Sequence, residues 1–122
     1  RQQLPFLKGT IAFYRTRSIP VTVIGSVLEY EARFPIALAK SIEMGGPAYT
    51  DRLRRTKIMA LDRLARQAAT EAGAAYYSVI NAECPMGRCA TISPVDGAPL
   101  HFDYGHVTQS GAEYVLRNLT LR

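Results

Sequence analysis

Residues 20–25 read Pro-Val-Thr-Val-Ile-Gly, a proline followed by a run of β-branched residues that predicts a buried strand. Before this run, residues 4–17 place apolar side chains at spacings of three and four, which predicts an amphipathic helix. A helix, a proline and then a buried strand is the order that an α/β sandwich with a mostly parallel sheet requires. The sequence around residues 20–25 therefore predicts the α/β class.

Two helices are predicted between this strand and the next. Residues 34–39 are expected to start a short helix that ends at the Gly-Gly-Pro of residues 45–47. Residues 51–72 carry an apolar stripe at helical spacing, with Thr50 as N-cap and a glycine after the last residue. Asp62 and Arg66 are expected to form an exposed ion pair one turn apart on this helix.

The last third of the chain predicts a second strand over residues 75–80 and a closing helix over residues 107–119, with Thr108 as its N-cap. Residues 90–92 are expected to pair with residues 100–102 across a proline-rich turn. Only two core strands are readable, whereas a complete doubly wound sheet usually has about five. The sequence therefore predicts an incomplete sheet.

The chain has 122 residues, 48% of them hydrophobic, and a formal net charge of +5. This is the size of one small domain with enough apolar content to form a core. No run of about 18 apolar residues is present, so no membrane-spanning helix is predicted within this sequence. Many of the basic residues fall in the helix over residues 51–72, where they form a solvated face or meet an anionic phospholipid or polysaccharide surface. No aromatic-basic motif supports nucleic-acid binding, so no nucleic-acid partner is expected.

Residues 102–108, Phe-Asp-Tyr-Gly-His-Val-Thr, hold the candidate catalytic pair. Asp103 can orient the imidazole of His106 and stabilise its cationic form, and the imidazole can then take a proton from a hydroxyl nucleophile. The alternatives are a loop histidine that bonds locally and a turn aspartate that accepts from the backbone amides after it. Both roles of Asp103 can hold at once. Asp96 is expected to be a plain Asp-Gly turn residue.

Four further residues could contribute to a site that contains this pair. Ser26 follows a strand, but the pattern of a serine nucleophile is absent and Ser26 is expected to be an ordinary loop residue. Tyr104 is a candidate for the rim of a pocket. Glu29 and Glu31 lie in one loop and either face a substrate or are solvated charges.

Cys84 and Cys89 flank Pro-Met-Gly-Arg, and three interpretations are open: a disulfide, a zinc site that recruits His101 and His106, or two unrelated thiols. His101 alternates with apolar neighbours on a predicted strand, which indicates an exposed cross-strand residue.

Three motifs of the last 40 residues carry a resemblance to a known family. They are Cys-Pro-Met-Gly-Arg-Cys at residues 84–89, Asp-Gly-Ala-Pro-Leu at residues 96–100, and Phe-Asp-x-x-His-Val-Thr-x-x-Gly-Ala at residues 102–112. Together they resemble the C-terminal end of an SGNH-type hydrolase domain, of the kind fused C-terminally to membrane acyltransferase-3 proteins that modify bacterial surface glycans. The resemblance implies a three-layer α/β/α sandwich with a mostly parallel, flavodoxin-like sheet.

In that family the final motif carries the aspartate and histidine of the triad, which map onto Asp103 and His106. The family's Gly-Asp-Ser nucleophile block, and the glycine and asparagine that complete its oxyanion hole, have no counterpart in this sequence. Residues 1–122 are therefore interpreted as one domain unit, the C-terminal portion of an SGNH hydrolase-like domain that is inactive alone. The resemblance implies that the full protein is a serine esterase or O-acyltransferase acting on acylated, above all acetylated, cell-envelope carbohydrate without a cofactor.

The resemblance also implies a place and partners. The full protein is expected in the bacterial periplasm or cell envelope, attached through an N-terminal membrane acyltransferase domain, with the missing strands supplied by a complementing segment or by a second copy in a homo-oligomer. An exported domain favours the disulfide between Cys84 and Cys89. The alternative is a non-catalytic accessory or interaction module, in one form binding zinc through Cys84, Cys89, His101 and His106.

Overall fold

Two short parallel strands form the small sheet of this α/β fold. The computed structural model describes residues 3–119. Strand β1 (Thr22–Ile24) pairs in parallel with β2 (Ala75–Tyr77), with Val23 opposite Tyr76. The described helices are α1 (Leu4–Arg15), α2 (Phe34–Glu43), α3 (Ala48–Leu53), α4 (Thr56–Glu71), α5 (Val79–Glu83) and α6 (Gln109–Asn118), with a 3-10 turn at Pro85–Gly87.

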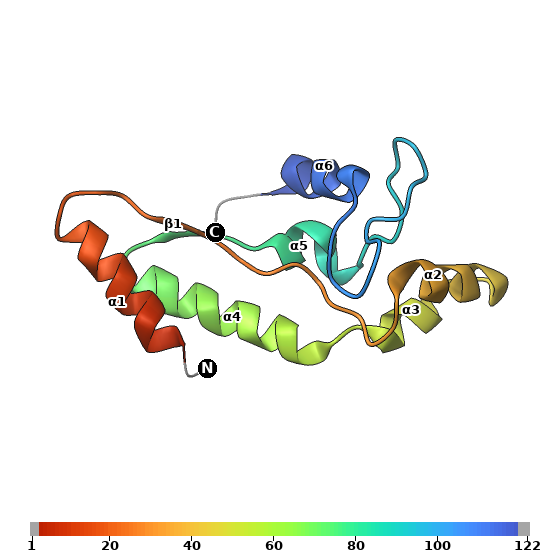
Figure 1. Ribbon diagram of the computed structural model, residues 1–122, viewed down its shortest axis with the longest axis horizontal. Coiled ribbons are helices and arrows are strands. Elements are labelled where there is room, and N and C mark those ends of the chain that lie inside the picture. Colours follow the sequence, from red (N-terminus) through yellow and green to blue (C-terminus); the bar gives the residue numbers. More distant parts are fainter. Residues whose placement is uncertain (1–2, 120–122) are drawn as a thin grey trace.

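Helices cover one face of the strand pair and its carboxyl end (Figure 1). Helices α1 and α4 pack below it in Figure 1, while α5 and α6 lie beyond and above its carboxyl end. Between α1, α4 and the strands the core contains Ile11, Ala69 and Tyr76. This confirms the predicted α/β class with a parallel sheet. None of the helices within residues 3–119 combines the length and apolarity needed to cross a bilayer.

The strand prediction over residues 20–25 is correct in place but wrong in burial. Val21 and Val23 face the core beside α1 and α4, whereas Thr22 and Ile24 point outward and Ile24 is 66% exposed. Because successive side chains of a strand alternate between faces, a β-branched run is buried on both faces only when both are covered. Here helices cover one face of β1.

The predicted helix over residues 51–72 is divided into α3 and α4. Arg54 and Arg55 are extended, and backbone bonds to the loop after β1 replace the helical ones: the Glu31 amide donates to the Leu53 carbonyl and the Arg55 amide to the Glu29 carbonyl, both at 2.8 Å. Thr50 lies buried inside α3 instead of capping it. The apolar pattern of residues 51–72 continues across Arg54 and Arg55, so the sequence did not predict that the helix is divided there.

Asp62 was expected to pair with Arg66 at the surface, and this is wrong. Its carboxylate is buried and accepts hydrogen bonds from the Tyr76 and Ser78 hydroxyls, each at 2.6 Å. Burial, followed by the bond to Asp62, raises the pKa of Tyr76. Asp62 therefore joins α4 to the end of β2.

The second strand is shorter than predicted because Ser78 ends it. The Ser78 hydroxyl accepts from the Asn81 amide at 3.0 Å, which caps α5. Val79 and Ile80 are β-branched but lie buried in that helix, so their packing outweighs their preference for a strand.

The C-terminal predictions are largely confirmed. The Leu100 amide donates to the Thr91 carbonyl at 3.0 Å and Ile92 bridges Pro99, so the expected pairing forms as an isolated contact rather than a ladder. Thr108 caps α6 by accepting from the Gly111 amide at 3.0 Å. Any side chain at residue 111 would overlap the Leu100 backbone, which explains the glycine.

Candidate functional site

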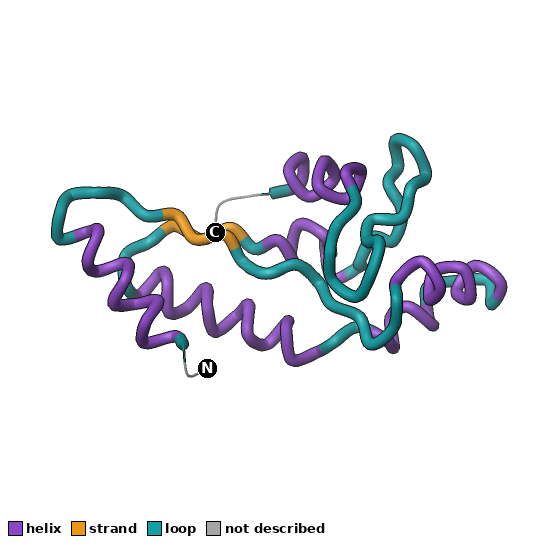
Figure 2. The backbone as a smooth tube through the Cα atoms, in the orientation of Figure 1, coloured by secondary structure: helices purple, strands orange, loops and turns teal. Residues whose placement is uncertain are grey.

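The Asp103–His106 loop belongs to the long connection between α5 and α6, which Figure 2 shows in teal beyond the carboxyl ends of both strands. His101 bridges Val107, and the Phe102 amide donates to the His106 carbonyl at 3.1 Å. These contacts close residues 102–106 into a tight hairpin. Side chains at the carboxyl ends of parallel strands are where ligands bind in open α/β folds.

Asp103 is bound by three groups within this hairpin. Its Oδ1 accepts from the Gly105 amide at 2.9 Å and from the His106 amide at 2.7 Å, while its Oδ2 lies 2.6 Å from His106 Nδ1. These contacts lower the pKa of Asp103 to about 2, with the Gly105 and His106 amides as the main causes and the imidazole next. The carboxylate is thus ionised, and both suggested roles, turn residue and partner of His106, hold together.

The His106 imidazole is held at its Nδ1 edge and open at the other. Its side chain is 77% exposed, and its ring stacks on Phe102 with centroids 5.8 Å apart and an 18° interplanar angle. A neutral imidazole that donates from Nδ1 to a carboxylate has Nε2 as its acceptor. Nε2 is the atom that can take a proton.

Backbone contacts from the loop after β1 fix the hairpin from outside. The Tyr30 amide donates to the Tyr104 carbonyl at 2.8 Å, and the Phe34 amide, at the start of α2, donates to the Asp103 carbonyl at 3.2 Å. Gly105 packs so closely on this loop that an added Cβ would lie 3.1 Å from Glu29 Cγ. The position of Asp103 is therefore set by backbone as well as by side chains.

A crevice of about 500 Å³ opens beside His106. The lining residues come from the loop after β1, from the start of α4 and from the hairpin: Ser26, Val27, Glu29, Arg55, Asp103, Tyr104, Gly105 and His106. Tyr104 is 45% exposed at this crevice, in accord with a place at its rim. Ser26 is a loop residue, as expected, and also lines the crevice.

His101 was expected to be exposed, and this is wrong. Its side chain is fully buried, with Nε2 2.6 Å from Glu83 Oε2, and its ring meets those of Tyr30 and Phe34 edge-on. Glu83 is equally buried, and its Oε1 accepts from the Leu28 amide at 3.3 Å. The alternation rule failed because the neighbours Leu100 and His101 are both fully buried: Leu100 lies against Gly111 in the first turn of α6, and His101 lies among Glu83 of α5, Tyr30 and Phe34. Glu83 was missed, since nothing near it in the sequence marks its partners.

Cys84 and Cys89 form a disulfide, as the resemblance implied. Their sulfurs are bonded to each other, while His101 contacts Glu83 and His106 contacts Asp103, so these four side chains are engaged elsewhere than in a common site. Within residues 3–119 there is no cluster of three or more histidine, cysteine or acidic side chains that could hold a metal ion.

Asp96 does more than the plain turn that was expected. Its Oδ1 accepts from the Ala98 amide at 3.0 Å, as in an Asp-Gly turn, but its Oδ2 also accepts from the Ser110 hydroxyl at 2.5 Å. The Ser110 contact and then the Ala98 amide lower the pKa of Asp96. Asp96 therefore ties the 93–99 turn to the first turn of α6.

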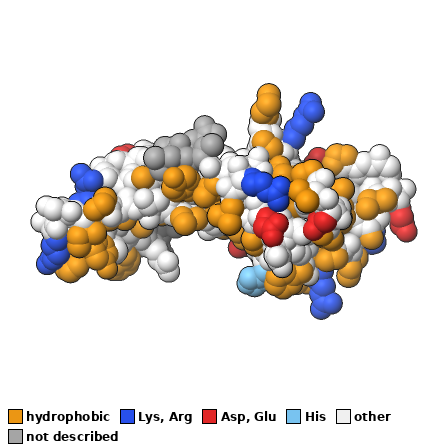
Figure 3. All heavy atoms as spheres, turned by 90° about the horizontal axis from the view of Figure 1, so that it is seen from above, with side chains coloured by type: hydrophobic (Ala, Val, Ile, Leu, Met, Phe, Trp, Pro, Cys, Tyr) orange, Lys and Arg blue, Asp and Glu red, His pale blue; other side chains and the backbone are white. Residues whose placement is uncertain are grey.

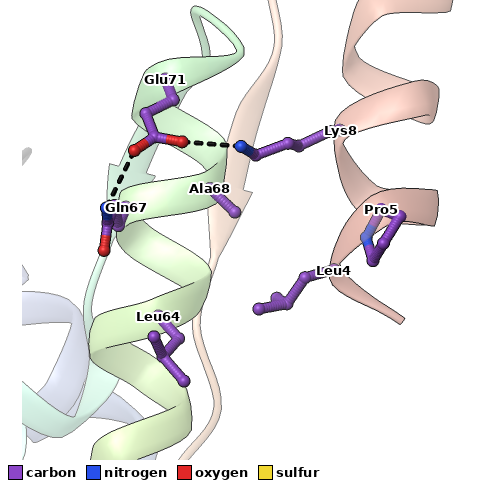
Figure 4. Close-up of a pocket in the computed structure, with 7 residues that line it drawn as sticks. All are labelled: Leu4, Pro5, Lys8, Leu64, Gln67, Ala68 and Glu71. Carbon is purple, nitrogen blue, oxygen red and sulfur yellow. Dashed lines mark hydrogen bonds and ion pairs between the residues drawn. The ribbon is translucent and has the colours of Figure 1, made fainter. Parts of the chain in front are cut away.

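A second hollow, between α1 and α4, is mostly apolar (Figure 4). Lys8 and Glu71 form an ion pair of 2.6 Å across one end of it, and Gln67 also binds Glu71. The charged side chains at the surface are mixed with apolar ones on the face drawn in Figure 3. Neither feature brings a base and an orienting carboxylate together, so the crevice beside His106 is the candidate site.

Comparison with known proteins gives one family and one solved structure. The family model described as "SGNH domain (fused to AT3 domains)" matches residues 1–120. The periplasmic domain of a lipopolysaccharide acetyltransferase from Salmonella ser. Paratyphi A has a similar fold, with a TM-score of 0.73 at 21% identity over 92% of this chain. The chain spans 45% of the length of that structure, and no curated protein sequence matches it. Because the family match extends over nearly the whole sequence, the chain belongs to the SGNH domains that are fused to AT3 domains.

Proposed function

We propose that the protein containing this chain transfers or hydrolyses acyl groups, above all acetyl groups, on cell-envelope carbohydrate. The observation that carries this proposal is the contact of 2.6 Å between Asp103 Oδ2 and His106 Nδ1 at the edge of a crevice. Membership of a domain family fused to AT3 domains supports it. The periplasm, with a membrane acyltransferase domain in the same protein, is the setting we propose.

The proposed nucleophile is a serine hydroxyl supplied from outside residues 1–122. His106 Nε2 takes the hydroxyl proton as the serine oxygen attacks the ester carbonyl, and Asp103 stabilises the imidazolium that forms. The tetrahedral intermediate collapses, the ester C–O bond breaks, and His106 returns the proton to the departing alcohol. Water or a sugar hydroxyl then attacks the acyl-serine by the same steps. Backbone amides or an asparagine outside this chain stabilise the oxyanion.

Ester hydrolysis by the full-length protein tests the proposal. His106→Ala is expected to lower kcat/KM for p-nitrophenyl acetate by about a thousandfold or more, because a triad without its base retains only residual catalysis. The fold should persist, since the imidazole is 77% exposed, and this is checked by circular dichroism and thermal unfolding.

A matched control is Glu113→Gln, which changes an exposed i,i+4 ion pair with Arg117 on α6. Its kcat/KM should equal that of the wild type. Full hydrolysis of p-nitrophenyl acetate by the His106→Ala protein would refute the proposed role of His106.

A further inference from the structure

Glu29 and Arg55 form a polar wall of the crevice beside His106, here named the Glu29–Arg55 wall. Arg55 Nη1 donates to Glu29 Oε2 at 3.0 Å, and the Arg55 amide donates to the Glu29 carbonyl at 2.8 Å. Glu31 Oε2 lies 3.4 Å from Arg55 Nε. Two side chains from distant parts of the sequence are thereby held in fixed relative positions.

The wall keeps hydrogen-bonding groups that a ligand can reach. The side chains of Glu29 and Arg55 are 38% and 40% exposed. Within residues 3–119, Glu29 Oε1 and Arg55 Nη2 make no hydrogen bond to the protein. Glu29 thus offers a carboxylate oxygen as acceptor, and the neighbouring Arg55 Nη2 offers two N–H donors. Since a hydroxyl group both donates and accepts, two neighbouring hydroxyls match this arrangement.

The charge of the wall argues against an anionic ligand. Glu29, Glu31 and the ionised Asp103 carry three negative charges, and Arg55 carries one positive charge. The site is locally negative although the whole chain has a net charge of +5. A ligand with a carboxylate would meet like charge in the crevice, which disfavours it relative to an uncharged one.

The wall also touches the catalytic hairpin. Glu29 Cγ is the atom closest to where a Cβ on Gly105 would lie, at 3.1 Å, and Gly105 directly precedes His106. A molecule bound to the wall is therefore beside the candidate base. A few well-placed polar groups of this kind fix the orientation of a ligand in a pocket.

We infer that Glu29 and Arg55 are specificity residues that bind two neighbouring hydroxyl groups of an uncharged sugar and discriminate against sugars that carry a carboxylate. This inference rests on the proposed function and adds the class of sugar to it.

The test compares three esters with the full-length protein: p-nitrophenyl acetate, a mono-O-acetylated methyl hexopyranoside, and the matching O-acetylated methyl hexuronide. The wild type should favour the neutral sugar over the hexuronide by about tenfold in kcat/KM. Glu29→Gln keeps the shape of the side chain but removes its charge. It should lower the ratio of kcat/KM for the neutral sugar ester to that for p-nitrophenyl acetate by about tenfold, and narrow the preference over the hexuronide.

Arg55→Lys is the second variant. It keeps the positive charge but loses the forked donors, so it should lower the same ratio while preserving the preference for the neutral sugar. Glu113→Gln is the control, because it neutralises a glutamate of a similarly exposed Glu–Arg pair on α6. Its ratio should equal that of the wild type.

A change of less than about threefold in the ratio for both Glu29→Gln and Arg55→Lys overturns the inference. So does a wild type that uses the hexuronide as well as the neutral sugar. Failure of the proposed function has a different signature, because His106→Ala would then hydrolyse p-nitrophenyl acetate like the wild type.

Discussion

Two carboxylate–histidine pairs in this molecule have the same oxygen–nitrogen distance, but one is exposed to solvent and the other is buried. Asp103 and His106 approach to 2.6 Å with side chains that are 34% and 77% exposed, whereas Glu83 and His101 approach to 2.6 Å and are fully buried. The members of the first pair are three positions apart in one hairpin. The second joins α5 to the segment that leads into that hairpin.

The contrast shows that the contact itself does not define a role. The exposed pair can meet a substrate because His106 Nε2 faces solvent, while His101 Nε2 is already bonded to Glu83 and its ring is covered by Tyr30 and Phe34. Removing one member of a buried carboxylate–histidine pair destabilises the fold, because the other member is then buried without its partner. We therefore expect changes in the exposed pair to act on catalysis and changes in the buried pair to act on stability.

Asp103→Asn should give the largest effect. The asparagine oxygen can still accept from the Gly105 and His106 amides, but its amide nitrogen would donate to His106 Nδ1 and place the imidazole proton on Nε2. The base is then in the wrong tautomer, and kcat for p-nitrophenyl acetate should fall by roughly a thousandfold to ten-thousandfold. Steady-state kinetics of the full-length protein measures this, with thermal unfolding as the check on folding. A kcat like that of the wild type would mean that Asp103 only shapes the turn.

His101→Ala should lower the stability of the protein, which tests the role of the buried pair. Removing the imidazole leaves Glu83 buried with the Leu28 amide as its one remaining hydrogen-bond donor among the described residues, which costs about 3–5 kcal/mol in the free energy of unfolding. Thermal or denaturant unfolding of the purified protein measures the loss. Glu83→Leu combined with His101→Leu should recover much of it, because replacing both partners leaves no buried charge. If His101→Ala alone proved as stable as the wild type, the buried pair would not be a structural contact.

Loss of the disulfide should have a smaller effect, confined to the side of the buried pair. Cys84 follows Glu83 directly, and the Ala90 amide donates to the Glu83 carbonyl at 2.8 Å. The bridge closes a short loop, so replacing both cysteines by serine should lower the free energy of unfolding by about 2 kcal/mol. Denaturant unfolding of the double variant, compared with the oxidised protein, gives the difference. A loss of kcat without a loss of stability would contradict this assignment.

The smallest effect should appear at low pH in the exposed pair. The pKa of Asp103 is about 2 in the folded protein, below its ordinary value of 3.8. A lowered pKa stabilises the fold above the ordinary value, and this contribution disappears as the pH falls through the folded value. It should therefore be complete at pH 5 and lost between about pH 4 and pH 2. A carbon NMR titration of labelled aspartate carboxyl groups should show one midpoint near 2, and a midpoint at 3.8 for Asp103 would contradict the three hydrogen bonds.

The sequence predicted what depends on neighbours in the chain. Asp103 and His106 are three positions apart, as are Thr108 and the Gly111 amide that it caps, so both contacts follow from local spacing. The parallel α/β class followed from the helix–proline–strand order. The catalytic role of His106 stays a prediction, because its contact with Asp103 does not by itself show a proton transfer.

Contacts between distant segments were not predictable in this way. Asp62 receives hydrogen bonds from residues 14 and 16 positions away, and His101 meets Glu83 across 18 positions. The break at Arg54 arises from pairing with Tyr30, which leaves no mark in the apolar pattern of residues 51–72. In each case a polar group is satisfied by a partner that only the tertiary fold supplies.

The Asp103 and Tyr104 carbonyls are held by amides of Phe34 and Tyr30, which every residue except proline possesses. These backbone contacts hold the hairpin without using the side chain of Glu29, which is partly exposed in the loop after β1. Under the proposed function, libraries randomised at residues 29 and 55 of the full-length protein would change which sugar ester is used while His106 keeps its place, which makes these two positions the first targets for engineering substrate choice.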